Sequence, residues 1–228
     1  MKYRYTQRVG YALGATVGII LLLILFSPEY TYLHAKGVMN SGHEALQCQD
    51  CHTPAAGTFR QQLQANVKYL LGHRTQAVAF GNNPVTNKEC VACHERPNDN
   101  HPVYRFNEPK YADVRKAIQP QLCTSCHQEH KGKRVTIKID FCSHCHDALE
   151  IKHDPVIPTH AKIVHDKDWS SCLGCHDFHG NHLMKINKLY SNKIIPKIVT
   201  DYFAGNDSPY SNKKKYSAKQ SKLAGSKI

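Results

Sequence analysis

The stretch Cys123-Thr-Ser-Cys126-His127 stands near the middle of the chain, and its pattern recurs on both sides of it. Two cysteines with two residues between them are followed at once by a histidine. The other four copies are Cys48-Gln-Asp-Cys51-His52, Cys90-Val-Ala-Cys93-His94, Cys142-Ser-His-Cys145-His146 and Cys172-Leu-Gly-Cys175-His176. Together the five copies use all ten cysteines of the 228 residues. The fold is therefore expected to be organised around five such turns.

The C-x-x-C-H pattern is typical of covalent haem attachment. On one helical turn, positions i, i+3 and i+4 share a face, so both sulfurs and the imidazole can address one porphyrin. A zinc half-site or a redox dithiol is the alternative, but neither needs a histidine after every pair. The sequence thus predicts five covalently bound haem c groups, each with its iron. Their proximal iron ligands would be His52, His94, His127, His146 and His176.

Eleven further histidines could supply the second axial ligands. His130 and His179 each lie three residues after a proximal histidine, too close to fold back onto the same haem. His43 and His165 lie five and seven residues ahead of a motif. A solvent-exposed histidine is the alternative reading for each. The candidate distal ligands are His43, His73, His101, His130, His165 and His179. Imidazole on both sides of each iron predicts low-potential, low-spin haems.

The first residues predict a membrane anchor. Residues 9–26 are eighteen apolar or neutral residues without a charge, close to the ~20 needed to cross a bilayer core. Lys2, Arg4 and Arg8 precede them, which favours a cytoplasmic N-terminus. A cleaved signal peptide is the alternative, but its apolar core is usually shorter. Gly10, Gly14 and Gly18 form a ridge of small residues that could pack against a partner helix.

The rest of the chain is poor in the residues that usually fill a core, so haem is expected to supply most of it. The fold class expected is mainly α and irregular, with one N-terminal transmembrane helix and a compact multihaem domain with little regular secondary structure. Thr58–Leu71 has a capping box and helical apolar spacing, and 135–139 alternates like a short strand. The expected segments are a cytoplasmic N-terminus (1–8), a transmembrane signal-anchor helix (9–29), a pentahaem domain (30–182) and a basic tail (183–228).

The tail carries most of the charge. The final 48 residues hold ten Lys and two Asp, a net of +8 out of the chain's +12. A short amphipathic helix is expected at 195–204, where Pro196 suits a first turn and Gly205 an end. It could dock on its own domain, on a partner or on the membrane. Residues 206–228 are expected to lack fixed structure.

Residues 43–182 resemble the multihaem class III cytochromes of the c3 and c7 type, and the histidines after Cys-His at 130 and 179 are similar to patterns in that group. The single N-terminal anchor ahead of the motifs resembles the NapC/NrfH quinol dehydrogenases. By layout the chain also resembles the pentahaem subunit of alternative complex III. These resemblances imply a single-pass protein of the bacterial inner membrane with its haem domain in the periplasm.

The expected function is electron relay from a membrane donor, either quinol or a quinol-oxidising complex, to a periplasmic cytochrome or reductase. Two alternatives stay open: a NapC/NrfH-like quinol dehydrogenase, and a cytochrome subunit of a larger respiratory complex. A non-catalytic carrier is favoured, because no C-x-x-C-K motif of the nitrite reductases occurs. No catalytic residue and no nucleic-acid partner are predicted.

Overall fold

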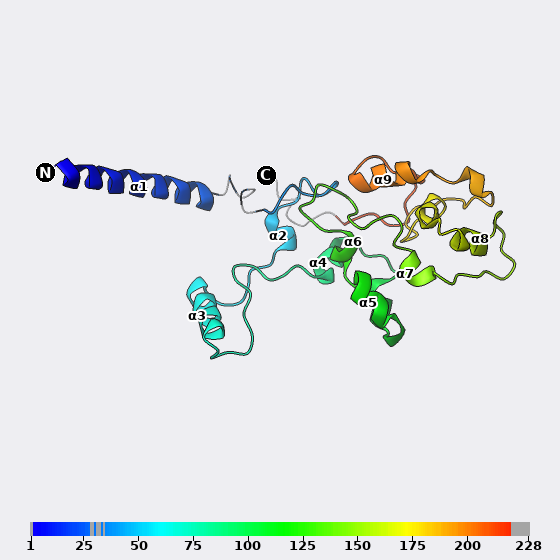
Figure 1. Cartoon of the computed structure of the whole chain (residues 1–228), viewed down its shortest axis with the longest axis horizontal. Helices are drawn as coiled ribbons and strands as arrows, with labels where there is room; N and C mark the ends of the chain where they lie inside the picture. The colour runs from blue at the N-terminus through cyan, green and yellow to red at the C-terminus, as the bar shows by residue number, and fades with distance from the viewer. Residues whose placement is uncertain (1, 28–29, 31–32, 34, 220–228) are drawn as a thin grey trace.

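The computed structural model describes residues 2–27, 30, 33 and 35–219. The last two residues of the anchor expected at 9–29, and residues 220–228 of the tail, lie outside the described residues. Helix α1 (Lys2–Phe26) extends away from the rest of the molecule, and all five Cys-His motifs lie on the other side of the 27–47 connection (Figure 1). Its 25 residues correspond to about 37 Å of helix.

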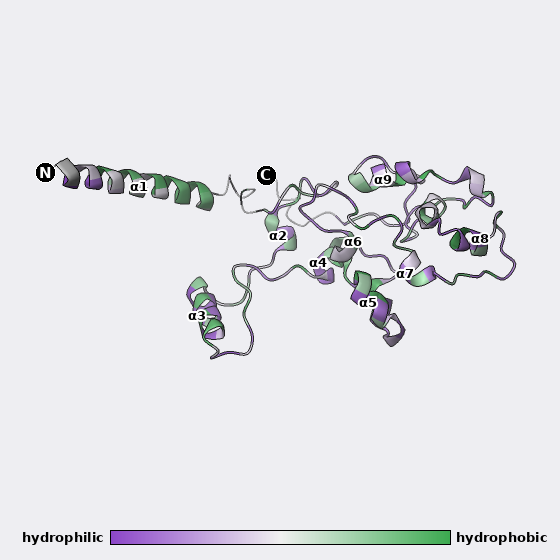
Figure 2. Cartoon of the chain, in the orientation of Figure 1, coloured by the Kyte–Doolittle hydropathy of each residue, from purple (hydrophilic) through white to green (hydrophobic). Residues whose placement is uncertain are grey.

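The Arg4–Leu25 part of α1 is long and apolar enough to cross a membrane, and the structure buries none of it. Apolar residues become denser toward the C-terminal end of the helix (Figure 2). No other described helix passes the same test. A Cβ atom added at Gly10, Gly14 or Gly18 would meet nothing within 4 Å, so this ridge is open along its whole length.

The remaining helices are short and are joined by irregular segments. They are α2 (Cys48–Cys51), α3 (Phe59–Leu70), α4 (Asn87–Cys93), α5 (Ala112–Ile118), α6 (Cys123–Cys126), α7 (Ser143–His146), α8 (His160–His165) and α9 (Pro196–Ala204), with 3-10 turns η2 (Val103–Asn107), η3 (Pro109–Tyr111), η4 (Trp169–Gly174) and η5 (Tyr190–Asn192). Among the described residues only isolated β-bridges occur and no strand. The expected fold class, mainly α and irregular, is confirmed.

The strand expected at 135–139 is wrong. The backbone N–H groups of Arg134 and Val135 both donate to the carbonyl of Phe203, the penultimate residue of α9, at 2.8 and 3.1 Å. A single carbonyl cannot start a β ladder, which needs a row of alternating partners. The apolar alternation instead places Ile137 and Ile139 against a small core cluster of Phe141, Leu173 and Val199.

That cluster is the main side-chain core, and it is small for a chain of this size. Only a handful of described apolar residues are buried in the whole protein. Val199 of α9 is completely buried in the cluster, so α9 docks on its own domain. Beside the cluster lies a cavity of about 2960 Å³, roughly three times the upper end of ~300–1000 Å³ for ordinary small-molecule pockets. The interior is thus built to hold something other than side chains.

After α9 the chain turns back across the domain as an extended segment, residues 206–219, which we call the C-terminal strap. Its backbone bonds to the segment after the fifth motif through Leu183, whose N–H donates to Lys213, and through Lys215, whose N–H donates to Asn181. At its end the N–H of Lys219 donates to the carbonyl of Cys93, in the second motif, at 2.9 Å. The expectation that 206–219 lack fixed structure is therefore wrong, because these backbone hydrogen bonds hold a polar segment in place.

Candidate functional site: a histidine- and cysteine-lined cavity

Each of the five motifs forms a single closed turn. In every one the N–H of the histidine donates to the carbonyl of the first cysteine, at 2.8–3.0 Å. This i to i+4 bond brings the first cysteine and the histidine to the same side of the turn, as the spacing predicts. All ten cysteines and all five of these histidines line the large cavity. None of the ten cysteines forms a disulfide.

Five other histidines face the five motif histidines across the cavity, one to each. The ring centres are 5.8 Å apart for His94 and His43, 6.3 Å for His52 and His130, 6.4 Å for His146 and His101, 6.2 Å for His127 and His179, and 6.1 Å for His176 and His160. No histidine occurs in two of these pairs. The set thus consists of five separate facing pairs.

The spacing of the pairs fits one metal ion between two imidazoles. An imidazole nitrogen lies ~2.0–2.1 Å from a divalent metal, and a ring centre lies roughly 1.1 Å behind its nitrogen, which gives ~6.3 Å between the ring centres. The five observed values, 5.8–6.4 Å, cluster around this distance. The residues present therefore fit haem iron with histidine on both faces.

The Nδ1 atom of each facing histidine is hydrogen-bonded to an oxygen. In three cases the oxygen belongs to a carboxylate: Glu129 for His43 at 2.7 Å, Asp154 for His160 at 2.9 Å and Asp99 for His179 at 2.8 Å. In the other two it belongs to a carbonyl: Phe178 for His101 at 2.6 Å and Gly37 for His130 at 3.2 Å.

Carboxylate and carbonyl oxygens only accept hydrogen bonds, so Nδ1 carries the proton in each of these rings. In a neutral ring, the lone pair is then on Nε2, the atom available to a metal. Such outer partners fix the tautomer and the ring orientation of a metal-ligating histidine. The hydrogen bonds therefore prepare the five rings as ligands.

Burial favours the neutral form of several of these rings. It lowers the pKa of His94, His101, His127 and His176, because a charged imidazolium loses hydration inside the protein. His43 differs: its hydrogen bond to Glu129 raises its pKa above the ordinary value. Neutral imidazole is the form that binds a metal, so the cavity suits ligation near neutral pH.

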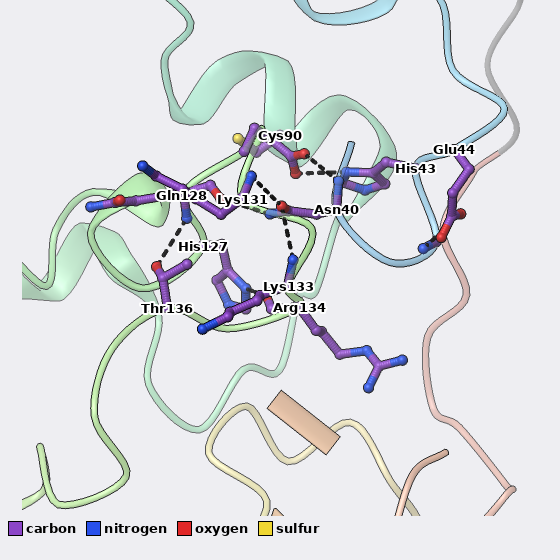
Figure 3. Close-up of polar contacts among 12 residues, drawn as sticks. Asn40, His43, Glu44, Cys90, His127, Gln128, Lys131, Lys133, Arg134 and Thr136 are labelled. Carbon is purple, nitrogen blue, oxygen red and sulfur yellow. Dashed lines mark hydrogen bonds and ion pairs between the residues drawn. The ribbon is translucent and has the colours of Figure 1, made fainter. Parts of the chain in front are cut away.

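The loop after the third motif positions two of the rings. Figure 3 shows Asn40 and His43 lying against the loop that follows His127. Asn40, almost fully buried, donates to the carbonyl of Gln128 at 2.8 Å and accepts from the N–H of Lys131 at 3.1 Å. The same loop reaches the first motif through His130, whose left-handed φ of 61° turns its ring toward His52.

Gly37 allows this loop to approach closely. A Cβ atom at position 37 would lie 2.5 Å from the backbone oxygen of His130, closer than any real Cβ contact. The carbonyl of Gly37 is also the acceptor for the His130 ring. Position 37 therefore needs glycine for contact rather than for conformational freedom.

Four of the six candidate distal histidines lie in facing pairs: His43, His101, His130 and His179. The structure does not bring the other two to the cavity. His165 is 83% exposed, with Nδ1 3.3 Å from Asp166. His73 lies in a shallow pocket of about 400 Å³ formed by residues 72–76. The role of these six as iron ligands stays a prediction.

The fifth facing histidine is His160, which is not one of the six distal ligands predicted from the sequence. It begins α8, after the N-cap Thr159, while His165 ends the same helix. Five residues along a helix turn a side chain by about 140°, so only one of the two can face the cavity. A sequence signal was present: Asp154, six residues before His160, accepts from both its ring and its backbone N–H.

His182 also lines the cavity but is already engaged on both sides of its ring. Nδ1 lies 2.9 Å from Asp177, and Nε2 lies 3.4 Å from the hydroxyl of Ser208. The backbone of His182 also pairs with that of Lys214 in an isolated β-bridge. His182 therefore ties the C-terminal strap to the segment after the fifth motif.

Comparison with known proteins agrees with this site. Residues 82–132, which contain the second and third motifs, match the family described as "Doubled CXXCH motif". This match and the five C-x-x-C-H turns support a multihaem c-type cytochrome. The chain is also similar to "Cytochrome c nitrite reductase subunit NrfH" of Nitratidesulfovibrio vulgaris, with 27% identity over 143 aligned residues. The alignment covers 54% of this chain and 82% of that protein. No solved structure matches this chain.

The comparisons thus support covalently bound haem c, and the cavity lined by paired imidazoles is where it would lie. The likeness of the chain to NrfH supports the NapC/NrfH-like arrangement expected from the single apolar N-terminal helix. The resemblance to class III cytochromes stays a prediction.

Proposed function

We propose that this cytochrome is a pentahaem electron relay with histidine on both faces of every iron. The observation that carries the proposal is the set of five facing histidine pairs, because each pair has the spacing of one six-coordinate metal and no motif lacks a partner. In this proposal the distal ligands are His43, His101, His130, His160 and His179.

When bound, haem iron supplies reversible one-electron oxidation and reduction, and two imidazole ligands keep its potential lower than histidine with methionine does. The protein's part is to hold the sites. The cysteines would fix the position of each haem, the facing rings would supply a second ligand to its iron, and the carboxylates and carbonyls behind Nδ1 would keep those rings oriented. Two imidazoles per iron leave no open position for a substrate, which favours a carrier over a small-molecule reductase.

The contacts between motifs indicate which sites are neighbours. The side chain of Cys90 lies beside that of Cys123, and the side chain of Cys142 lies beside that of Cys172. If each haem site is numbered by the motif that would hold it, sites two and three adjoin, and so do sites four and five. His130, three residues after the third motif, faces the first, and His179, three residues after the fifth, faces the third. The proposed series runs from site one through site three to site five, with sites two and four beside it.

The first site is the nearest to the anchor. Helix α2, which carries the first motif, is the motif helix closest to α1 (Figure 1). We therefore place electron entry at the first site and exit at the fourth or fifth. The proposed donor is membrane quinol or a quinol-oxidising complex, and the proposed acceptor is a periplasmic cytochrome or reductase. The open ridge of Gly10, Gly14 and Gly18 would accept a helix of that donor complex.

Haem counting and spectroscopy test the proposal. Intact mass of the native protein is expected to give five haem c per chain, and low-temperature electron paramagnetic resonance only low-spin ferric iron. Rapid reduction by a membrane donor and onward transfer to a second cytochrome should follow. Zinc in place of iron, fewer than five haems, or a dominant high-spin signal would contradict it.

The likeness to NrfH favours a second candidate, in which the chain oxidises quinol itself or serves as the cytochrome subunit of a larger respiratory complex. Direct reduction of the purified protein by a quinol analogue in detergent would favour the dehydrogenase. Co-purification of stoichiometric partner subunits after gentle solubilisation would favour the complex. A protein that is reduced only by another membrane protein, and purifies alone, would be the relay.

A further inference from the structure

Between the first and second motifs the chain forms an arm, residues 54–82, closed at its base by the bridge between Pro54 and Asn82. Helix α3 is its outgoing half, and an irregular segment returns from Leu71 to Asn82. Figure 1 shows the arm projecting from the rest of the molecule. None of residues 54–81 lines the haem cavity. The arm therefore lies outside the haem cavity.

Two amide side chains of α3 face the returning segment of the arm. Gln62 is 5% exposed, donates to the carbonyls of Ala55, Ala56 and Gly57, and accepts from the N–H of Gly81 at 2.9 Å. One turn later Asn66 accepts from the N–H of Val78 at 3.1 Å and donates to its carbonyl. The two amides hold the returning segment along this side of the helix.

The apolar side of α3 faces outward. Phe59, Leu63, Val67, Leu70 and Leu71 lie on one stripe at helical spacing, and Leu70 is 80% exposed. Phe80 of the returning segment packs against Phe59, with ring centres 5.1 Å apart, and is itself half-exposed. A helix on a water-soluble domain normally turns such a stripe toward the core. A contiguous exposed apolar surface of this kind marks a place of contact with something else.

The charge of the arm suggests what that contact is. No Asp or Glu occurs between Asp50 and Glu89, whereas the arm contains Arg60, Lys68 and Arg74. An apolar stripe bordered by basic residues and free of acidic ones is the composition of helices that lie in the interface of an anionic membrane. A protein partner has no such requirement for the absence of acidic residues.

The position of the arm agrees with this. Along the long axis of the molecule, α3 lies level with the C-terminal end of α1, the membrane-spanning candidate, and farther toward α1 than any other described helix (Figure 1). The helix axis runs across that of α1 rather than along it. A bilayer around α1 would therefore present its surface to the arm.

We propose that α3 lies in the anionic headgroup region of the membrane that α1 spans, as a second point of attachment. This inference rests on the membrane anchorage in the proposed function. Because the base of the arm adjoins the first motif, attachment would fix the height and tilt of the first haem site over the lipid. The occupant of the apolar stripe is thus a lipid surface.

Photo-crosslinking to lipid tests the proposal on the whole haem-loaded chain in nanodiscs of phosphatidylglycerol and phosphatidylethanolamine. A lipid with a diazirine near the top of its acyl chain is activated, and labelled peptides are identified by mass spectrometry. Labels are expected in α1 and in 59–71, with none in α5, a helix without a fully buried residue that lies farther from α1. Labelled α1 with unlabelled α3 would overturn the inference alone, whereas an unlabelled α1 would overturn the anchorage as well.

A pair of variants separates lipid contact from other contacts. Leu70→Gln removes one exposed apolar side chain and is expected to lower labelling of 59–71 by roughly tenfold. Gln64→Ala, on the exposed polar side of the same helix, should leave it unchanged. Crosslinks of 59–71 to a second, isotopically distinct copy, in place of lipid, would assign the stripe to a dimer and contradict the proposal. Equal labelling in uncharged phosphatidylcholine discs would contradict the role of Arg60 and Lys68.

Discussion

A hydrogen bond behind each facing ring distinguishes a prepared ligand from a surface histidine. His160 and His165 make this comparison within one short helix, since the first has Asp154 behind its ring and the second is exposed to solvent. The carboxylate restricts the ring of His160 to one tautomer and one direction. Of the two, only His160 also has a motif histidine opposite its ring, with the ring centres 6.1 Å apart.

Replacement of the two histidines one at a time tests this difference. His160→Ala is expected to leave the fifth iron without its sixth protein ligand and so to create a high-spin ferric signal equal to one haem. His165→Ala should leave the spectrum unchanged. Spin quantitation by electron paramagnetic resonance measures both. A high-spin haem in the His165 variant, with none in the His160 variant, would reverse the assignment.

The pair of Glu129 and His43 gives a prediction about pH. Burial opposes ionisation of Glu129, but its hydrogen bond with His43 outweighs this and lowers the pKa of the carboxyl below its ordinary 4.5. A lowered carboxyl pKa adds to the free energy of unfolding above pH 4.5, and this contribution is lost as the pH falls. The stability difference between the wild type and Glu129→Gln should therefore be constant near neutral pH and shrink in acid.

The same measurement tests ligation of His43. In the protein without a bond from His43 to iron, the hydrogen bond to Glu129 raises the pKa of His43, and the stability from that shift is lost as the pH rises above the ordinary 6.5. A bond between iron and Nε2 would keep a second proton off the ring of His43, so this loss of stability would not occur. A stability difference that also falls above pH 6.5 would show that His43 is not a ligand. Glu150→Gln, at an exposed carboxylate, is the control.

At the scale of elements, local structure follows from local sequence. Thr58 caps α3 through the N–H of Gln61, and Gln61 returns the bond to Thr58, as the capping box predicts. Each Cys-His motif forms its own turn by an i to i+4 bond. The direction of α3 could not be predicted, because apolar spacing alone does not say whether a stripe faces a core or a lipid surface.

The facing histidines could be predicted only in part for a related reason. His52 and His130 meet across the chain only because Asn40 holds the loop after His127 and Gly37 lets it approach. Such long-range contacts leave no periodic signal in the sequence. His130 was found by its place after a motif, whereas His160 has no comparable position.

Gly37→Ala is expected to disturb one site without touching a ligand. The new Cβ atom would meet the backbone of His130 at 2.5 Å, so the loop must move and carry its ring away from His52. We expect one high-spin haem, together with intact attachment of all haems by mass. Gly42→Ala, where nothing lies within 4 Å of the new atom, is a control for the cost of its left-handed φ of 94°. An unchanged spectrum for Gly37→Ala would contradict the assignment of His130 as a ligand of the first iron.

The C-terminal strap is held by one buried hydroxyl at its middle. Tyr210 donates from its hydroxyl to the carbonyl of Leu173, in the turn of the fifth motif, at 2.8 Å. Tyr210→Phe would leave that buried carbonyl without its partner, and the free energy of unfolding should fall by ~1–2 kcal/mol. Tyr104→Phe, at an exposed tyrosine, should cost less than about 0.5 kcal/mol. Denaturant unfolding followed by haem absorbance compares them, and equal costs would contradict the role of the strap.

At the scale of the whole molecule, the scarcity of buried apolar residues could be predicted from composition, and the cavity is its structural counterpart. Phe141, Leu173 and Val199 cannot by themselves stabilise a domain of this length. A group that binds only the folded state adds its binding free energy to stability. The arrangement of the five sites, by contrast, depends on contacts between motifs and could not be read from their spacing along the chain.

The domain is therefore expected to depend on haem to unequal degrees at different sites. Without any covalent haem the chain should show no cooperative unfolding transition. Loss of the third attachment, by Cys123→Ala with Cys126→Ala, should unfold the domain, because this site adjoins the second and its His127 faces His179, which follows the fifth motif. Loss of the first, by Cys48→Ala with Cys51→Ala, should be tolerated. Circular dichroism during heating measures this, and a reversed order would contradict the proposed series.

The strap also bears on how such a protein is made. Residues 206–219 emerge from the ribosome after all five motifs, yet they form part of the wall around the cavity and bond to Cys93, more than a hundred positions earlier. A porphyrin can enter the cavity only while these wall residues are not yet in place. The docking of these late residues would then complete assembly. A chain truncated before Asn206 would leave the cavity open, and it should be degraded faster by proteases.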